Sequence, residues 1–331
     1  MPHTPNGWYG VLRSHELAKG KVLPLTVFGR QLVAFRGKDG DARVLSAFCP
    51  HLGAHLGHGG KVRGNEIECP FHAWRFAGDG RCSHAPFSKR TPDVGVRAWK
   101  VIERTGVVYV WIHALGAEPT YEPPAVPQFE GLRGWGEARE LRGRYRIHIQ
   151  ELRENIVDEA HFQHIHRQKE PPLQTFEASG PYAEMRQELR VFDIEPSPLK
   201  IEFTAKMYGP GVMDVSATGP MNLRALALTT PLDEGYSEMR LLSSLENPLG
   251  SRILGALLRW YYSERSSAEV SIEEKIWDNK THLPRPVFLP HEKGIRRLRD
   301  WYQQFYEGAA AATEASPPRR LVCVTAAPAP Q

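Results

Sequence analysis

Short runs of apolar and β-branched residues recur along the first part of the chain, with turn residues between them. The runs are residues 22–35, 43–48, 65–69 and 97–112. Runs of this kind between turn signals are typical of strands joined as hairpins, and Thr105-Gly106 is a clear turn signal inside the last run. Residues 1–115 are therefore predicted to form a small antiparallel β domain.

A proline-rich stretch separates this domain from a second, larger one. Residues 116–143 contain Pro119, Pro123, Pro124 and Pro127. Proline fixes the backbone in extended conformations, so a segment of this composition acts as a spacer. We predict that residues 116–143 are a linker.

The remaining chain combines longer alternating runs with helical stretches. The predicted strands are residues 144–149, 184–194, 199–208, 212–217, 222–230 and 237–245. The predicted helices are residues 151–166, 251–260, 263–280 and 293–306. Consecutive strands separated by Pro and Gly favour an antiparallel sheet. The predicted fold class is therefore α+β, with flanking helices on the sheet of residues 144–307 and a disordered, Ala- and Pro-rich tail over 308–331.

Composition narrows the classes of function. A chain of 331 residues is long enough for two domains with packed cores. The formal net charge of +4 is too small to indicate a nucleic-acid partner. No apolar run is long enough for a membrane span, and the N-terminus lacks a charged-then-apolar signal pattern. We expect a cytoplasmic protein without a membrane span.

Two short loops carry the most specific chemical pattern of the chain. The first contains Cys49 and His51, and the second contains Cys69 and His72. Zinc sites usually pair two cysteines in one loop and two histidines in the other. A Rieske [2Fe–2S] cluster instead places two thiolates on one iron and two imidazoles on the other. One Cys and one His in each loop suit the Rieske arrangement, so these four residues are predicted to bind the cluster.

A predicted helix of the second domain carries a second set of metal-binding residue types. Asn155, Asp158 and His161 recur every third residue, so they share one helix face. His164 would share that face, whereas His166 lies about 140° away from His161 on an ideal helix. Joint metal binding by His161 and His166 would need a bulge or a helix end. The residue pattern leaves His164 and His166 open as alternative ligands.

Two histidines and one carboxylate form the facial triad of non-haem Fe(II) oxygenases, which leaves coordination positions for O₂ and substrate. The competing interpretation is a polar helix face with solvated histidines. The Rieske pattern favours the metal site, because a one-electron donor domain needs an acceptor for its electrons.

With both sets in view, the chain resembles the α subunits of Rieske non-haem iron oxygenases, to about residue 307. Within them it is similar to the 3-ketosteroid 9α-hydroxylase oxygenase components and the Neverland-type cholesterol 7-desaturases. The matching stretches are residues 69–82, 88–92, 154–162, 276–277 with Lys280, and 301–306. The resemblance implies a Rieske domain followed by a helix-grip-like catalytic domain that binds a mononuclear Fe(II).

The resemblance also implies roles for the histidine helix. The family spacing of Asp, His and a second His selects His166 over His164. Asp158 is implied to bridge, by hydrogen bonds, the iron-binding His161 and a Rieske histidine of a neighbouring subunit in a head-to-tail homotrimer. Asn155 is expected to support the helix or to approach the iron, with a purely structural hydrogen bond as the alternative.

The chain departs from the family at the third iron ligand. The family usually has Asp four residues before the tryptophan of the Ile-Trp pair, and this chain has Glu273 there. On a helix Glu273 lies on the same side as Val270 and Trp277, so we expect it to face inward and to be the ligand. The alternatives are the acidic neighbours Glu269, Glu274 and Asp278, or a site with no protein carboxylate.

Together these patterns predict the terminal oxygenase of a multicomponent Rieske system. A flavin- or ferredoxin-type reductase is expected to supply electrons from NAD(P)H, with O₂ as co-substrate. The resemblance implies a hydrophobic, steroid-like or polycyclic substrate, with hydroxylation favoured over desaturation or oxidative demethylation. A Rieske electron carrier is the rival function, but a carrier needs only the first domain.

Overall fold

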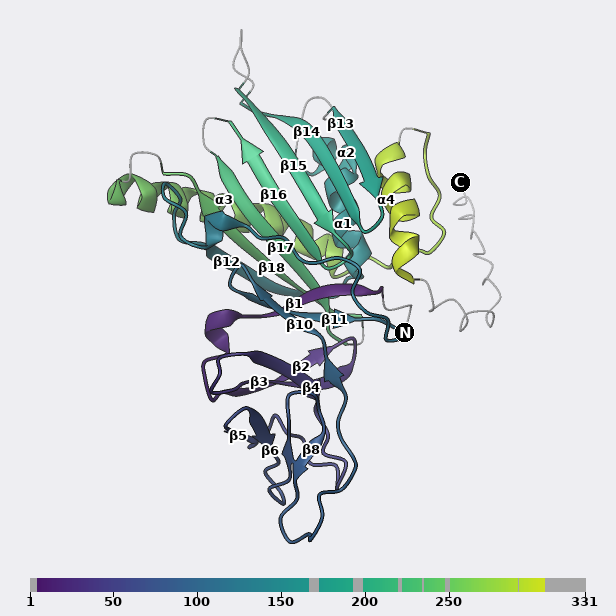
Figure 1. Cartoon of the computed structure of the whole chain (residues 1–331). Coiled ribbons are helices and arrows are strands. Elements are labelled where there is room, and N and C mark those ends of the chain that lie inside the picture. The colour runs from purple at the N-terminus through teal and green to yellow at the C-terminus, as the bar shows by residue number, and fades with distance from the viewer. Residues whose placement is uncertain are drawn as a thin grey trace, which may run out of the picture.

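The computed structural model describes residues 5–166, 173–192, 199–219, 222–233, 235–247, 251–290 and 292–306. A smaller region built from strands lies below a larger region of sheet and helices (Figure 1). The predicted tail over 308–331 lies outside the described residues. Among the described residues, no helix is both long and apolar enough to cross a membrane.

The smaller region consists of three antiparallel sheets. The first contains β1 (Gly7–Arg13), β11 (Val107–Ile112) and β10 (Val101–Arg104). The second contains β2 (Val22–Val27), β3 (Arg30–Arg36), β4 (Ala42–Ser46) and β9 (Ala98–Trp99). The third contains β5 (Lys61–Arg63), β6 (Glu66–Glu68), β7 (Arg75–Phe76) and β8 (Cys82–His84). All the strand pairs are antiparallel, as predicted.

The hairpin turns follow from the backbone that their residues adopt. Thr105 and Gly106 join β10 to β11 with φ values of 56° and 68°. Two left-handed residues in a row give the turn twist that matches paired strands, which confirms the predicted turn. The turn between β2 and β3 lies at Phe28 and Gly29.

One seven-stranded antiparallel sheet dominates the larger region. Its order is β12-β18-β17-β16-β15-β14-β13. The strands are β12 (Arg139–Tyr145), β13 (Gln174–Ser179), β14 (Tyr182–Phe192), β15 (Leu199–Tyr208), β16 (Val212–Thr218), β17 (Leu223–Pro231) and β18 (Ser237–Leu245). The five strands predicted between residues 184 and 245 are confirmed, and β13 is an additional strand.

The strand predicted over residues 144–149 is displaced, because strand β12 already begins at Arg139, inside the predicted linker of residues 116–143. Strand β12 ends at Tyr145, and helix α1 (Ile149–Val157) begins soon after it. His148 ends the extended segment because its Nδ1 accepts a hydrogen bond from the backbone N–H of Gln150 at 3.3 Å. A side chain that caps the first turn stabilises a helix start at that position.

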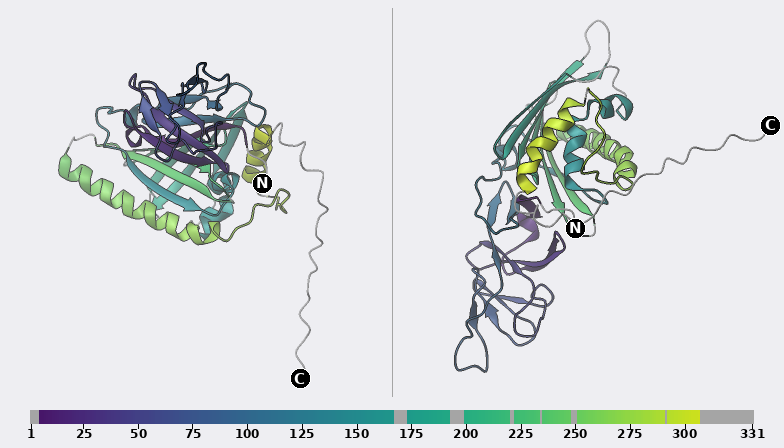
Figure 2. Two further views of the ribbon diagram at one scale, coloured as in Figure 1. Left: turned by 90° about the horizontal axis from the view of Figure 1, so that it is seen from below. Right: turned by 90° about the vertical axis from the view of Figure 1, so that its right-hand side faces the viewer.

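Helices cover one face of the large sheet (Figure 2). Besides α1 they are α2 (Glu159–His164), α3 (Arg252–Trp277) and α4 (Lys293–Gln303), and the short 3₁₀ turns are Ser14–Glu16, Pro127–Phe129 and Gln304–Tyr306. The two helices predicted over 251–280 are thus one continuous α3. Helix α4 packs closely on the end of α1. A Cβ atom added at Gly294 would lie only 2.6 Å from the carbonyl oxygen of Val157, so only glycine fits there without a shift. The sheets with their flanking helices confirm the α+β class.

A shared apolar core joins the two regions. Trp8 of β1, Tyr109 of β11 and Leu228 of β17 belong to one buried cluster, which also includes Tyr121 from the segment between the regions. Burial of large aromatic side chains is the main favourable contribution to such contacts. The two regions are therefore held by packed side chains as well as by the connecting segment.

Ion pairs to buried carboxylates of α1 hold this helix against the chain that follows α3. The Glu151 carboxylate, 2% exposed, accepts from His282 at 2.6 Å and pairs with Lys280 at 2.5 Å. Arg299 of α4 pairs with Glu154, one turn further along α1, at 2.7 Å. Burial alone would raise the pKa of Glu151, but hydrogen bonds from His282 and Lys280 outweigh burial and lower the pKa to about 2.

We predict that Glu151→Gln destabilises the protein in a pH-dependent way. The carboxylate is favoured in the folded state, so its contribution is complete above the unfolded pKa near 4.5 and is lost as pH falls through about 2. The loss at neutral pH should be on the order of 3 kcal/mol. Thermal unfolding is followed by circular dichroism from about pH 7 down to about pH 3.5. The difference in melting temperature between wild type and Glu151→Gln should shrink as the pH falls.

The matched control is Glu118→Gln, which removes an exposed carboxylate paired with Lys100. Exposed pairs contribute little, so this variant should melt close to wild type at every pH. A gap between wild type and Glu151→Gln that stays constant over the pH range would contradict the assigned charge state of Glu151.

Candidate metal centres

A break in the histidine helix sets the geometry of the first centre. The sequence pattern predicts one helix over 151–166, but α1 ends at Val157 and Asp158 is not helical, with φ −87° and ψ 96°. Its Oδ1 accepts a hydrogen bond from the backbone N–H of His161 at 3.1 Å and so caps α2. Helix α2 ends at His164, which leaves His166 beyond the helix end. The helix end that joint metal binding requires is therefore present.

Three predicted ligands converge at this helix end. The Nε2 atoms of His161 and His166 lie 3.1 Å apart, and each lies 2.9 Å from Oε1 of Glu273 on α3. The three side chains are mostly buried. His164 is exposed and is not part of this group.

The donor set fits a facially coordinated metal ion. Ligand atoms about 2.1 Å from an octahedral metal, at right angles to one another, lie roughly 3 Å apart, whereas tetrahedral ligands lie about 3.4 Å apart. The observed separations of 2.9, 2.9 and 3.1 Å match the octahedral case. Two imidazoles and one carboxylate are also the donor types of the non-haem Fe(II) triad.

Charge supports Glu273 as the anionic member of the set. Burial raises the pKa of the Glu273 carboxyl, but hydrogen bonds from His161 and His166 outweigh burial and lower it below its usual value. The alternatives are less well placed: Glu274 is exposed, and Asp278 accepts from the backbone N–H of Arg146 at 2.8 Å. The side chain of Glu269 lies outside the described set.

Two further predicted residues lie beside the triad. The side-chain amide of Asn155, on α1, donates a hydrogen bond to Oε2 of Glu273, on α3. Asp158 uses one carboxylate oxygen to cap α2. The Nδ1 atom of His161 is buried and has no hydrogen-bond partner among the described residues.

The two Cys-His loops share one backbone design. In the first, the carbonyl oxygen of Cys49 accepts from the N–H of Gly53 at 2.9 Å, and in the second, that of Cys69 accepts from Ala73 at 3.1 Å. Gly53 and Ala73 have φ values of 75° and 56°. Each loop thus closes a turn that begins at the cysteine and ends on a left-handed residue, which places each histidine within its turn.

The four side chains of these loops are arranged in two pairs. Cys49 and Cys69 are buried, at 2% and 4% exposure, and the rings of His51 and His72 lie 4.8 Å apart. Burial raises the pKa of Cys49 to about 11, and the adjacent Cys69 thiol adds to this shift. Nδ1 of His72 is buried without a partner among the described residues. Paired thiols inside and paired imidazoles outside fit a Rieske cluster.

Trp74 is a contact of this site that sequence reasoning missed. Its ring stacks on His51, with centroids 4.6 Å apart and planes 5° from parallel. Trp74 lies within residues 69–82, the stretch that carries the resemblance to the Rieske family, so that resemblance could have identified it. A stacked tryptophan fixes the plane of an otherwise exposed imidazole.

The two centres lie far apart within one chain. Figure 1 places β5, β6 and β8, which flank the Cys-His loops, at the lower end of the molecule, and α2 at its upper end. Any transfer of electrons between the centres inside one chain would have to cross much of the molecule.

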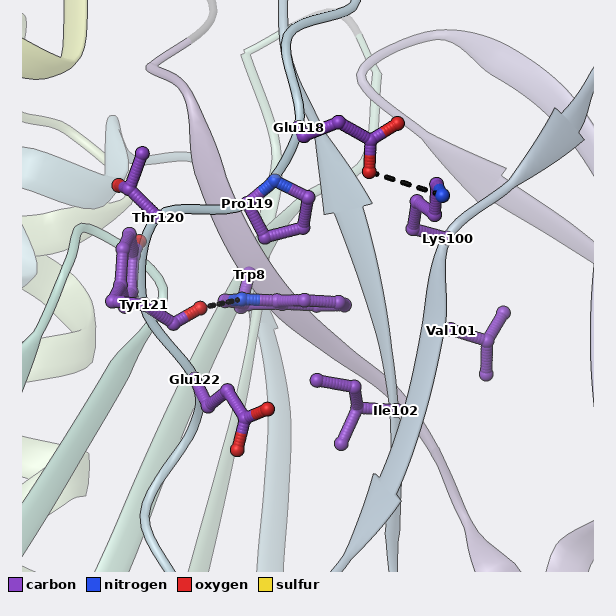
Figure 3. Close-up of a pocket in the computed structure, with 9 residues that line it drawn as sticks. All are labelled: Trp8, Lys100, Val101, Ile102, Glu118, Pro119, Thr120, Tyr121 and Glu122. Carbon is purple, nitrogen blue, oxygen red and sulfur yellow. Dashed lines mark hydrogen bonds and ion pairs between the residues drawn. The ribbon is translucent and has the colours of Figure 1, made fainter.

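A separate surface cavity of about 430 Å³ shares no residue with either centre (Figure 3). The indole N–H of Trp8 donates to the carbonyl oxygen of Tyr121 at 2.7 Å, and Lys100 pairs with Glu118 at 3.0 Å beside it. These polar groups are satisfied within the chain. The cavity marks where the segment between the two regions packs on the smaller one.

Comparisons with known proteins agree with the two-centre arrangement. Residues 7–100 match the Rieske [2Fe-2S] domain, and residues 110–306 match the 3-ketosteroid 9α-hydroxylase C-terminal domain. The cholesterol 7-desaturase of Bombyx mori is 34% identical over 92% of this chain and 70% of that protein. The oxygenase component of 3-ketosteroid-9-alpha-monooxygenase from Rhodococcus rhodochrous is 30% identical over 91% of this chain and 83% of that protein.

A solved structure of dicamba monooxygenase shares the fold, with a TM-score of 0.73 and 19% identity over 93% of this chain and 98% of that chain. The fold and the two domains define a Rieske-type oxygenase. The chain belongs to the 3-ketosteroid 9α-hydroxylase family of these enzymes. It is the oxygenase component of a multicomponent system, with a Rieske cluster and a mononuclear iron as cofactors and a reductase as partner, as predicted.

We predict that His161→Ala removes the mononuclear iron and leaves the Rieske cluster in place. The change deletes one donor of the proposed triad and touches neither Cys-His loop. Iron content should fall from about three to about two per chain while the Rieske absorption stays intact.

The matched control is His164→Ala, one helical turn away and exposed. It should keep all the iron and the full absorption spectrum. Loss of the Rieske absorption in His161→Ala, or equal iron loss in His164→Ala, would count against two independent centres.

Proposed function

We propose that this oxygenase oxidises a C–H bond of a hydrophobic, steroid-like or polycyclic substrate, with hydroxylation favoured. The convergence of His161, His166 and Glu273 behind a Rieske domain is the observation that carries the proposal. Its substrate class rests on relatives named for cholesterol and 3-ketosteroids. We propose Cys49, His51, Cys69 and His72 as cluster ligands, and His161, His166 and Glu273 as ligands of the mononuclear iron.

Iron held by this triad would supply one-electron chemistry toward O₂. The chain's own residues hold the site and keep it dry. The two imidazole Nε2 atoms and Oε1 of Glu273 lie 2.9 to 3.1 Å from one another. The triad side chains are largely buried between α2 and α3, so bulk water reaches them poorly. A largely dry, fixed donor set favours oxidation of a bound substrate over side reactions.

Asp158 is proposed as the bridge between centres of neighbouring subunits. The two centres lie at opposite ends of one chain (Figure 1). The buried Nδ1 of His161 lacks a partner among the described residues, and Asp158 already contacts the same residue through its backbone N–H. A head-to-tail homotrimer would bring the Rieske histidine of one subunit to Asp158 of the next. The finer partner proposal is a flavin- or ferredoxin-type reductase that draws on NAD(P)H.

Desaturation is the second candidate reaction. It is supported by the 34% identity to a cholesterol 7-desaturase, a likeness comparable with the 30% identity to the hydroxylase component. Oxidative demethylation remains a third outcome of the same C–H oxidation. We also propose that the protein works in the cytoplasm.

A product screen tests the proposed substrate class. The purified oxygenase, a surrogate reductase, NAD(P)H and O₂ are incubated with sterols, 3-ketosteroids and non-steroid polycyclic compounds, and products are analysed by mass spectrometry. We expect a steroid or sterol product that has gained one oxygen, or lost two hydrogens if the enzyme desaturates. His161→Ala is the blank. Failure of the iron-loaded enzyme to oxidise any of the sterols, 3-ketosteroids or polycyclic compounds would contradict the proposal.

Replacement of Asp158 tests the bridge. Asp158→Ala should retain both metal centres yet lower turnover about 10- to 100-fold, because the link between subunits is lost. Asp158→Ser is the matched variant, since serine still caps a helix but is too short to bridge. It should keep the iron content of wild type and lose turnover equally. Normal turnover of either iron-loaded variant would show that Asp158 does not connect the centres.

A further inference from the structure

We infer that Asn155 is a positioning residue that holds the Glu273 carboxylate so that one oxygen, Oε1, faces the metal. The inference rests on the proposed function of His161, His166 and Glu273 as the metal ligands. It concerns the position at which the resemblance leads us to expect Asp and the chain has Glu273.

The two oxygens of the Glu273 carboxylate have different partners. Oε1 lies 2.9 Å from Nε2 of His161 and of His166, whereas Oε2 accepts the side-chain amide N–H of Asn155. Glu273 is 9% exposed, so water competes little for either oxygen. The carboxylate is thus divided between a metal-facing oxygen and an oxygen that is held by the protein.

Glutamate needs such a partner more than aspartate does. Its additional methylene adds a rotatable bond, and fixing a long acidic side chain costs conformational entropy. A free carboxylate also binds metal ions through either one or both oxygens. Binding through both would occupy a position that the facial triad leaves for O₂ or substrate. A donor on Oε2 restricts the rotation and makes two-oxygen binding less favourable.

The fold holds the donor in place. Asn155 lies one turn beyond Glu151 on α1, and Glu151 is anchored to Lys280 and His282, which follow the C-terminal end of α3. Glu273 lies in the last turns of the same α3. Ion pairs to the buried Glu151 carboxylate therefore hold α1 against the segment that directly follows α3, close to the Asn155–Glu273 contact.

A double-mutant cycle separates positioning from direct metal binding by Asn155. Asn155→Leu keeps the branching of the side chain, with two methyl groups in place of the amide, and removes its donor, and Glu273→Asp withdraws the carboxylate from Asn155. The two single variants, the double variant and wild type are purified with their Rieske clusters. The dissociation constant of the mononuclear site for Fe(II) is then measured by chelator competition without turnover.

We expect Asn155→Leu to weaken Fe(II) binding about 10- to 100-fold in the wild-type background, the range typical of residues that orient a metal ligand. In the Glu273→Asp background the same change should alter binding by less than about threefold, because the contact is already lost. Visible spectra of the Co(II)-loaded site should differ between wild type and Asn155→Leu, since freeing Oε2 changes the coordination.

Rieske absorption and the melting temperature serve as controls for folding, and Asn155→Ser replaces Asn155→Leu if the latter fails either control. Equal weakening in both backgrounds would make Asn155 a ligand in its own right and overturn the inference. Unchanged Fe(II) affinity in Asn155→Leu would also overturn it. Wild-type protein that binds no Fe(II) outside the Rieske cluster would refute the proposed triad itself.

Discussion

The end of α1 at Asp158 is the local feature on which the mononuclear centre depends. A continuous helix would point His161 and His166 about 140° apart. The break and the short α2 instead leave His166 beyond a helix end, and both imidazoles meet Glu273 within about 3 Å. Asp158 stabilises this arrangement by capping α2, so the residue proposed to connect subunits also shapes the site that it would serve.

The architecture combines a firm connection between domains with a wide separation of centres. Trp8, Tyr121 and Leu228 bury a common core between the two regions, so the Cys-His loops are held at a fixed place relative to the large sheet. That place is the far end of the molecule from α2 (Figure 1). This separation of the centres within one chain is the physical argument for the proposed trimer, in which another copy would deliver the electrons.

Local patterns made much of the molecule predictable. Thr105-Gly106 and the paired Cys-His loops depend on residues close in sequence, and the α+β class followed from the spacing of turns and runs. The helix break at Asp158 was not predicted, although Asp158 followed by Glu159 is a typical helix start. Strand β13 was missed because Phe176 is its only buried side chain. The contact between Asn155 and Glu273 joins residues 118 positions apart, and no local pattern encodes it.

The central claim is that one chain holds two separate iron centres. Anomalous diffraction at the iron absorption edge, on crystals of the iron-loaded protein, tests this most directly. The account predicts two peaks, one between the loops of Cys49 and Cys69 and one enclosed by His161, His166 and Glu273. A single peak at the loops, or a second peak held by other side chains, would contradict it.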